Sequence, residues 1–263
     1  MRHCFPNDAH RSTIAKDSAL ESITFVRIIG QTTVWTMARL SHTATLLSTE
    51  LLDANDLAAE AIVKGENLEA FRLIEGVTRR IAALAPSLLR HKVKADPDEA
   101  CHKIQIRSYY RNDASLITTD GFGNFCPSPF VLKSLGGQLL PDQFKVSVAV
   151  AIFNMALACH LQYKITECSQ KTRILSSRAR ILYRKAAKLL EGNLDGEHME
   201  IFLAICINAM GEAQDQGDLE QIRYWTHRFD KAVNTVKKLP SLFPYILQRE
   251  VFYIGQFLAA QAA

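Results

Sequence analysis

The chain has 263 residues, of which 48% are hydrophobic and 22% are charged, and its formal net charge is +4. This length is enough for one or two domains with a substantial core, and so mild a charge does not indicate a nucleic-acid binder by itself. No apolar run reaches the ~18 residues that span a bilayer, so we expect no membrane partner. The longest run, residues 146–161, contains Asn154 and predicts a buried helix.

Residues 1–33 are irregular and rich in Ser and Thr, and they predict a poorly ordered or loosely docked N-terminal segment. The acidic residues Asp8, Asp17 and Glu21 argue against a transit peptide, because such peptides are poor in acids. The remaining residues, 34–263, are expected to form one helical domain.

The six cysteines form no C-x-x-C pair, a pattern typical of reduced and mostly buried thiols. We therefore expect an intracellular protein, in the cytoplasm, with the nucleus left open. Cys159, His160 and Cys168 have the wrong spacing for a structural zinc site, so neither a metal nor a cofactor is expected.

Apolar residues recur at helical spacing from Val34 onward. The first helix is expected to end at Asp53, and Asn55–Asp56 is interpreted as the cap of a short helix over 57–64. Gly65 marks a break, and Asn67 caps a long helix predicted over 68–90, with Pro86 near its end.

Residues 91–141 interrupt the helical rhythm. Residues 103–107 alternate polar and apolar side chains, which favours a strand, and residues 130–132 could be its partner. We therefore predict a short irregular or β-hairpin insert near residues 103–134.

Helical spacing resumes after the insert and continues to the end of the chain. Glycines and a proline stand at the expected breaks between helices. The predicted helices are Gln143–Lys164, Gln170–Glu191, Glu197–Gln216, Leu219–Lys238 and a last one from Ser241 or Pro244.

Two of these helices carry a small or aromatic residue at matching positions along one face, namely Ala179, Tyr183 and Ala186, and then Trp225, Phe229 and Ala232. The helix before each carries a pair with a small second residue, Met155–Ala156 and Met210–Gly211. Together they resemble the tetratricopeptide (TPR) repeat, a helix hairpin whose aromatic fills the space between neighbouring hairpins. The resemblance implies an all-α fold, a TPR-like antiparallel helix-hairpin array that forms an α-α superhelix.

The same resemblance implies a function, because the first helices of TPR hairpins line a concave groove that binds a peptide or helix. We expect a non-catalytic protein–protein interaction scaffold with an unidentified protein partner. Carried over by position, the peptide-binding groove would present Phe153, Asn154, Leu157, His160, Asn208, Glu212 and Asp215.

Asn154 has two interpretations, because an amide on an apolar helix must find a hydrogen-bond partner. It could grip the backbone of a bound peptide, or it could form a hydrogen bond between two helices. The sequence does not separate these alternatives.

No residue pattern indicates catalysis. Cys101–His102 and Cys159–His160 are adjacent in sequence, and neighbours on a helix do not face each other. Residues 121–123 lack the lysine and helix of a phosphate loop. We therefore expect no enzyme activity and no small-molecule substrate.

A basic run lies between Lys171 and Lys188, and four of its residues fall near one helix face: Arg173, Arg180, Arg184 and Lys188. The simpler interpretation is a solvated helix back. The alternative function is binding of nucleic acid or another acidic surface, although missing aromatics argue against nucleic acid.

Overall fold

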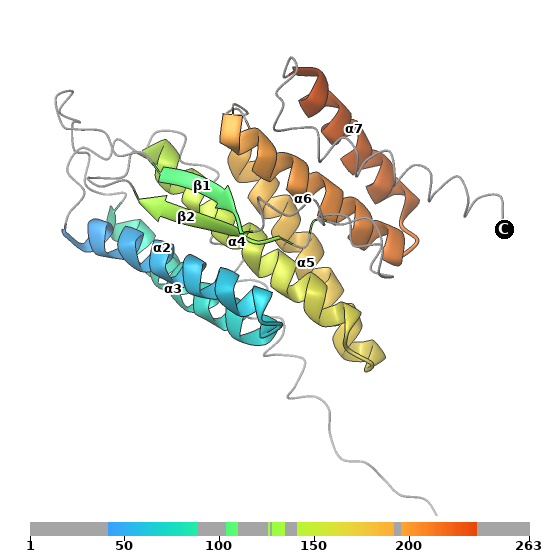
Figure 1. Ribbon diagram of the computed structural model, residues 1–263, viewed down its shortest axis with the longest axis horizontal. Helices are drawn as coiled ribbons and strands as arrows, with labels where there is room; N and C mark the ends of the chain where they lie inside the picture. The colour runs from blue at the N-terminus through green and yellow to red at the C-terminus, as the bar shows by residue number, and fades with distance from the viewer. Residues whose placement is uncertain are drawn as a thin grey trace, which may run out of the picture.

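The computed structural model describes residues 42–88, 104–109, 126, 128–134, 141–191 and 196–235. In these ranges the chain is mostly helical, with six helices and one two-stranded sheet (Figure 1). The expected N-terminal segment 1–33, the start of the first helix and the last helix lie outside the described residues.

The helix boundaries agree closely with the apolar periodicity of the sequence. For α3 to α6 the predicted ends fall within two residues of the observed ends. The helices are α2 (His42–Val63), α3 (Asn67–Leu88), α4 (Pro141–Lys164), α5 (Ser169–Leu190), α6 (Gly196–Asp215) and α7 (Leu219–Thr235).

The prediction of a break at Asn55–Asp56 was wrong, because α2 runs through both residues without interruption. Their side chains bind the backbone of a strand instead of capping a helix. The predicted break at Gly65 is confirmed. Gly65 has φ 79°, and the Gly65 and Glu66 N–H groups donate to the carbonyls of Ile62 and Ala61. A glycine adopts this conformation without steric cost and ends α2.

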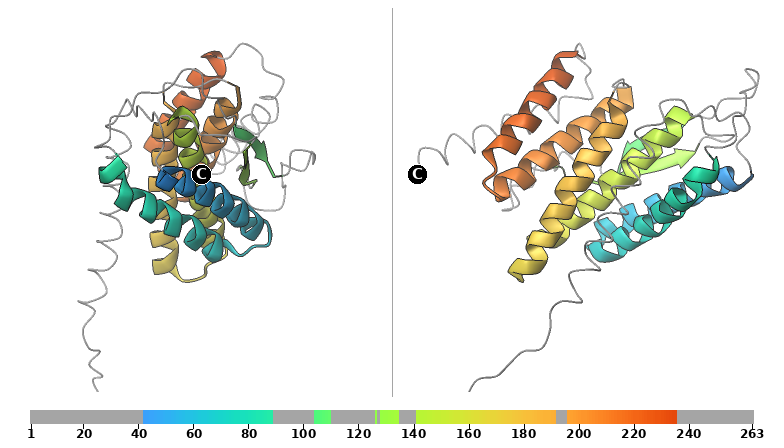
Figure 2. Two further views of the ribbon diagram at one scale, coloured as in Figure 1. Left: turned by 90° about the vertical axis from the view of Figure 1, so that its left-hand side faces the viewer. Right: turned by 180° about the vertical axis from the view of Figure 1, so that it is seen from behind.

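The helices pack side by side in chain order, each on the next (Figure 2). In addition, α2, α4 and α6 contact one another in turn, so these three form one layer of the molecule. Among the described helices, only α4 is long and apolar enough to cross a membrane, and 83% of the relevant window is buried inside the protein. That composition also suits a core helix, and α4 lies in the centre of the core.

The two predicted aromatic faces are buried as expected. Tyr183 is fully buried between Ala179 and Ala186, and Trp225 and Phe229 are 1% exposed. The tilted ring of Phe153 lies 6.1 Å from that of Tyr183, so α5 packs on α4 through this pair. These residues anchor the helix pairs of the second half of the chain.

The expected β insert is confirmed as an antiparallel pair, β1 (Ile104–Ser108) and β2 (Phe130–Ser134). Ile106 lies opposite Leu132 in the register. β2 packs against α2 and α4, and Phe130 and Leu132 are 1% and 2% exposed. The sheet therefore shares its core with the layer formed by α2, α4 and α6.

Replacing Tyr183 with Ala should destabilise the protein by about 2–4 kcal/mol, because a fully buried aromatic leaves a cavity between α4 and α5. Chemical denaturation of the full chain measures this loss. Ile174→Ala is the control on the same helix, since Ile174 is 43% exposed and should change stability by less than about 0.5 kcal/mol. Equal losses for both variants would mean that this side of α5 is not the packed one.

Candidate functional site

The edge of β2 that faces the helices has its backbone bound by side-chain amides. Asn154 on α4 contacts both polar groups of one residue: its Oδ1 accepts from the Phe130 N–H at 3.0 Å, and its Nδ2 donates to the Phe130 carbonyl at 2.7 Å. Asn55 on α2 donates to the same carbonyl at 3.0 Å. Neither asparagine is exposed to solvent.

The same two-point contact recurs four residues earlier in the chain. Asn208 on α6 accepts from the Cys126 N–H at 2.6 Å and donates to the Cys126 carbonyl at 3.0 Å. Asn208 is also fully buried. Each of the helices α2, α4 and α6 thus contributes one buried asparagine, and we call Asn55, Asn154 and Asn208 the amide row.

The amide row is itself connected by hydrogen bonds. Asn154 Nδ2 donates to Asn55 Oδ1 at 2.9 Å, so α4 and α2 are joined at this point. The interpretation of Asn154 as a hydrogen bond between two helices is therefore confirmed. The backbone that Asn154 also binds belongs to this chain, so its binding of a partner peptide stays a prediction. Asp56 extends the set by accepting from the Leu132 N–H at 2.9 Å, and burial raises the pKa of its carboxyl.

The amide row holds one stretch of chain, Cys126 with residues 128–134, which we call the inserted segment. Cys126, Ser128, Phe130 and Leu132 are at most 2% exposed, and Pro129 is buried as well, whereas Val131 is half-buried and Lys133 is exposed. Phe130 packs on Phe153 with ring centroids 5.3 Å apart. Within β2, from Phe130 to Lys133, the more buried side chains are every second residue, as expected for a strand with one face on a core.

The predicted groove residues do not line an open surface in this structure. Six of them are at most 1% exposed: Phe153, Asn154, Leu157, His160, Asn208 and Glu212. The physical reason differs along the face. The inserted segment covers Phe153, Asn154 and Asn208, whereas His160 and Glu212 are turned into polar contacts between helices. Leu157 belongs to the apolar core.

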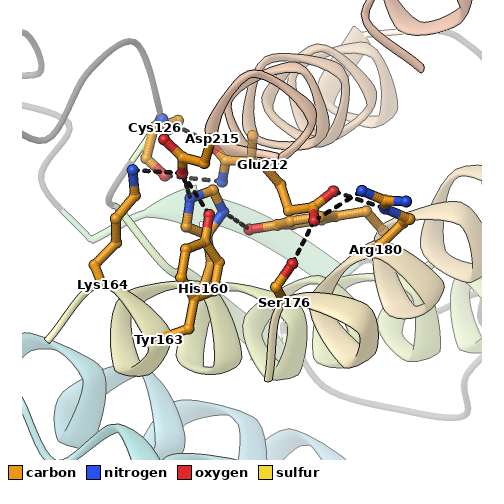
Figure 3. Close-up of polar contacts among 10 residues, drawn as sticks. Cys126, His160, Tyr163, Lys164, Ser176, Arg180, Glu212 and Asp215 are labelled. Carbon is orange, nitrogen blue, oxygen red and sulfur yellow. Dashed lines mark hydrogen bonds and ion pairs between the residues drawn. The ribbon is translucent and has the colours of Figure 1, made fainter. Parts of the chain in front are cut away.

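Asp215, the seventh predicted residue, lies in a polar cluster at one end of α4 and α6 (Figure 3). It accepts from the Tyr163 hydroxyl at 2.6 Å and pairs with Lys164 at 2.5 Å. His160 Nε2 lies 3.9 Å from the Asp215 carboxylate, and His160 Nδ1 lies 3.2 Å from the Tyr183 hydroxyl. Burial, and then Lys164, lower the pKa of His160 to about 3, so its ring is neutral near pH 7.

Glu212 anchors a second polar cluster between α6 and α5 (Figure 3). Its carboxylate is 1% exposed, accepts from Ser176 at 2.6 Å and pairs with Arg180 at 3.0 Å. Arg180 also pairs with Asp218 at 3.2 Å, just before α7. The Glu212 carboxylate is the main cause that raises the pKa of the Arg180 guanidinium.

The basic face predicted on α5 is therefore smaller than expected. Arg180 belongs to the Glu212 cluster and not to a solvated back, because it reaches across to α6 and Asp218. Lys185, from the same run, is buried, and desolvation lowers its pKa to about 8. Arg173, Arg184 and Lys188 stay exposed on α5, as expected for a solvated helix face.

Among the described residues, the buried cysteines and His160 offer little reactive chemistry. Cys168 differs, because it is exposed just before α5 and a hydrogen bond from the Lys171 backbone lowers the pKa of its thiol. Burial raises the pKa of the Cys126 and Cys159 thiols to about 11 and about 12, so both are protonated near pH 7. Cys159 and His160 are both buried and adjacent on α4. In the described part of the chain, no three His, Cys, Asp or Glu side chains are grouped as metal ligands would be.

Sequence reasoning missed the partner of the amide row. Asn55 was assigned to a helix cap, and Phe130 was placed in a strand without a role. Two signals were present: each asparagine stands in a strongly apolar helix, and residues 126–130 read Cys-Pro-Ser-Pro-Phe. Because a residue before proline avoids the helical region, Cys126 and Ser128 favour an extended backbone.

No family model matches the chain, and no similar protein is found among the curated proteins or the solved structures.

Asn154 and Asn55 should be energetically coupled, because they bind each other and share the Phe130 carbonyl. In a double-mutant cycle with Asn154→Ala and Asn55→Ala, measured by chemical denaturation, we expect a coupling of about 1 kcal/mol or more. A matched cycle of Asn154→Ala with Ile174→Ala, which shares no contact, should be additive. Additivity in both cycles would contradict the shared contact.

Arg180→Ala should destabilise the protein by about 3 kcal/mol, because it leaves the buried Glu212 carboxylate without its cation. Arg184→Ala removes an exposed arginine from the next turn of α5 and should cost less than about 0.5 kcal/mol. Thermal and chemical denaturation of the two variants measure the difference. If both variants lost little stability and by the same amount, Arg180 would belong to a solvated basic face and not to the Glu212 cluster.

Proposed function

We propose that this protein is a non-catalytic protein–protein interaction scaffold, in which the layer formed by α2, α4 and α6 binds an extended polypeptide segment by its backbone. The observation that carries the proposal is the repeated two-point contact. Asn154 and Asn208 each bind the N–H and the carbonyl of a single residue. A side-chain amide of this geometry offers one donor and one acceptor to any extended chain.

In backbone binding of this kind, the main-chain contacts supply the affinity and the side-chain contacts supply the sequence preference. Amide contacts to N–H and C=O groups are the same for every residue except proline, as in strand addition to a sheet edge. The side chains that point inward then select the sequence. At this face the neighbours of the bound backbone are Phe153, the uncharged amide row and the Asp56 carboxylate, which together suit an apolar peptide better than an acidic one.

The TPR resemblance supports the same function. Consecutive helix hairpins with buried Tyr183 and Trp225 between them, and one inner layer of alternate helices, are what a TPR-like array requires. In such an array the inner helices present the binding face. The amide row lies on those helices, one residue on each.

The alternative, an acidic surface or nucleic-acid partner on α5, has less support. Arg180 is paired with two carboxylates and Lys185 is buried, which leaves three of the highlighted basic residues exposed on that helix. Few cations give weak and strongly salt-dependent attraction to a polyanion. The alternative remains an outcome of the test below.

A phage-displayed library of unstructured peptides, selected on the full chain, tests the proposal. Selected peptides should bind Asn208→Ala about tenfold more weakly than wild type, because one two-point backbone contact is lost. The double variant Arg173→Glu/Arg184→Glu is the matched control and should bind normally. Peptides that ignore Asn208→Ala but are lost with the charge reversals would favour the α5 alternative and contradict the amide row.

A further inference from the structure

We infer that the inserted segment is a built-in ligand that occupies the partner's position on the amide row. The partner is then an extended peptide with the same inward pattern: a small residue, a second small residue, an aromatic and an aliphatic at alternate positions. This inference rests on the proposed function, and it adds both the class of ligand and a means of regulation. A partner binds this face only by displacing the inserted segment.

The inward pattern of the inserted segment defines what the face accepts. Phe130 is 1% exposed and lies against Phe153, which in turn contacts Tyr183. Ser128 is fully buried, and Cys126 and Leu132 are 2% exposed. Among the described residues of the segment, Lys133 is the one charged side chain, and it is exposed to solvent. Burying an unpaired charge at these positions would be costly, so an acidic or basic peptide is excluded at the inward positions.

The backbone of the segment is prepared for this mode of binding. Proline lacks an N–H group, so residues 127 and 129 cannot donate, and the two-point contacts fall on residues 126 and 130. The residues before the prolines, Cys126 and Ser128, avoid the helical region. A segment that is already extended when free loses less conformational entropy on binding.

The contacts of the segment allow it to leave without unfolding a helix. In the part of the chain that the structure describes, the helix groups that form hydrogen bonds with the segment are side chains: Asn55, Asp56, Asn154 and Asn208. Because these four side chains are the helix partners, the segment can dissociate from them without breaking a backbone hydrogen bond inside a helix. The segment belongs to the stretch between α3 and α4, residues 89–140, and in the described sheet its strand neighbour is β1 alone.

Tethering makes the segment an effective competitor. A ligand that belongs to the same chain as its site has an effective concentration of about millimolar. If the segment and a free peptide both have an intrinsic Kd of about 10 µM, the free peptide binds the wild-type chain about 100-fold more weakly than it binds a chain whose segment is displaced. A substitution that weakens the binding of the segment to the amide row should therefore raise the affinity of the protein for a free peptide.

The test uses a fluorescent nonapeptide with the sequence of residues 126–134, with Cys126→Ser to avoid oxidation, and measures anisotropy on the full chain. Phe130→Ala in the protein removes the aromatic anchor of the segment, and this variant should bind the probe about tenfold or more tightly than wild type. Adding Asn154→Ala to it should abolish the gain. Lys133→Ala, which changes an exposed residue of the same segment, should behave as wild type. A probe carrying Phe130→Ala should bind no variant.

Two measurements cover the case in which Phe130→Ala is poorly folded. The probe should raise the melting temperature of that variant, because a ligand stabilises the state that binds it. In the wild-type chain, hydrogen exchange of residues 126–134 should proceed through a local opening and be faster than that of α4. Exchange of the segment only with global unfolding, or no effect of the probe on any variant, would overturn the inference.

The outcomes also separate this inference from the proposed function. Equal and Asn154-dependent binding of the probe to wild type and Phe130→Ala would mean that the segment does not compete. In that case the peptide-binding function stands and the inference fails. If no variant binds the probe while library peptides still require Asn208, again only the inference fails. If library peptides are also indifferent to Asn208, both fail.

Discussion

The structure depends on one constraint: an extended backbone buried among helices must find hydrogen-bond partners that a helix backbone cannot supply. The helices use their own N–H and C=O groups internally, so Cys126 and the edge of β2 that is not paired with β1 must be satisfied by side chains. Asn55, Asn154 and Asn208 meet this demand with amides, and Asp56 adds a carboxylate. Three polar residues in otherwise apolar helices are explained by this single requirement.

The polar clusters around Glu212 and Asp215 help to fix the positions of the helices that carry the amide row. Glu212 with Arg180 ties α6 to α5, and Asp215 with Tyr163 and Lys164 ties α6 to α4. The side chain of Asn208 leaves α6 one turn before Glu212, so its position relative to Asn154 follows from these ties. A two-point contact tolerates little displacement, because hydrogen bonds weaken steeply with distance and angle. Ion pairs between helices therefore help to keep the amide row in register.

Apolar periodicity was sufficient for the helices because each one buries a single face on a neighbour, as α5 does with Ala179, Tyr183 and Ala186. It failed at Asn55–Asp56, where a polar pair was interpreted as a cap although α2 continues through it. Locally, a cap and a buried side chain that binds a distant backbone have the same composition. Only the presence of β2 beside α2 distinguishes them.

The sequence alone determined the ends of α3 to α6 and the break at Gly65, because these follow from apolar spacing and glycine conformation within a few residues of the chain. It also predicted the two strands and that the Asn154 amide needs a hydrogen-bond partner. The tertiary structure decided what Asn154 binds, which residues share its task and why the face is covered. It also showed that Arg180, which the sequence placed on an exposed basic face, forms an ion pair with Glu212. Those contacts join residues 24 to 99 positions apart, and no local pattern encodes which distant backbone or carboxylate a side chain will meet.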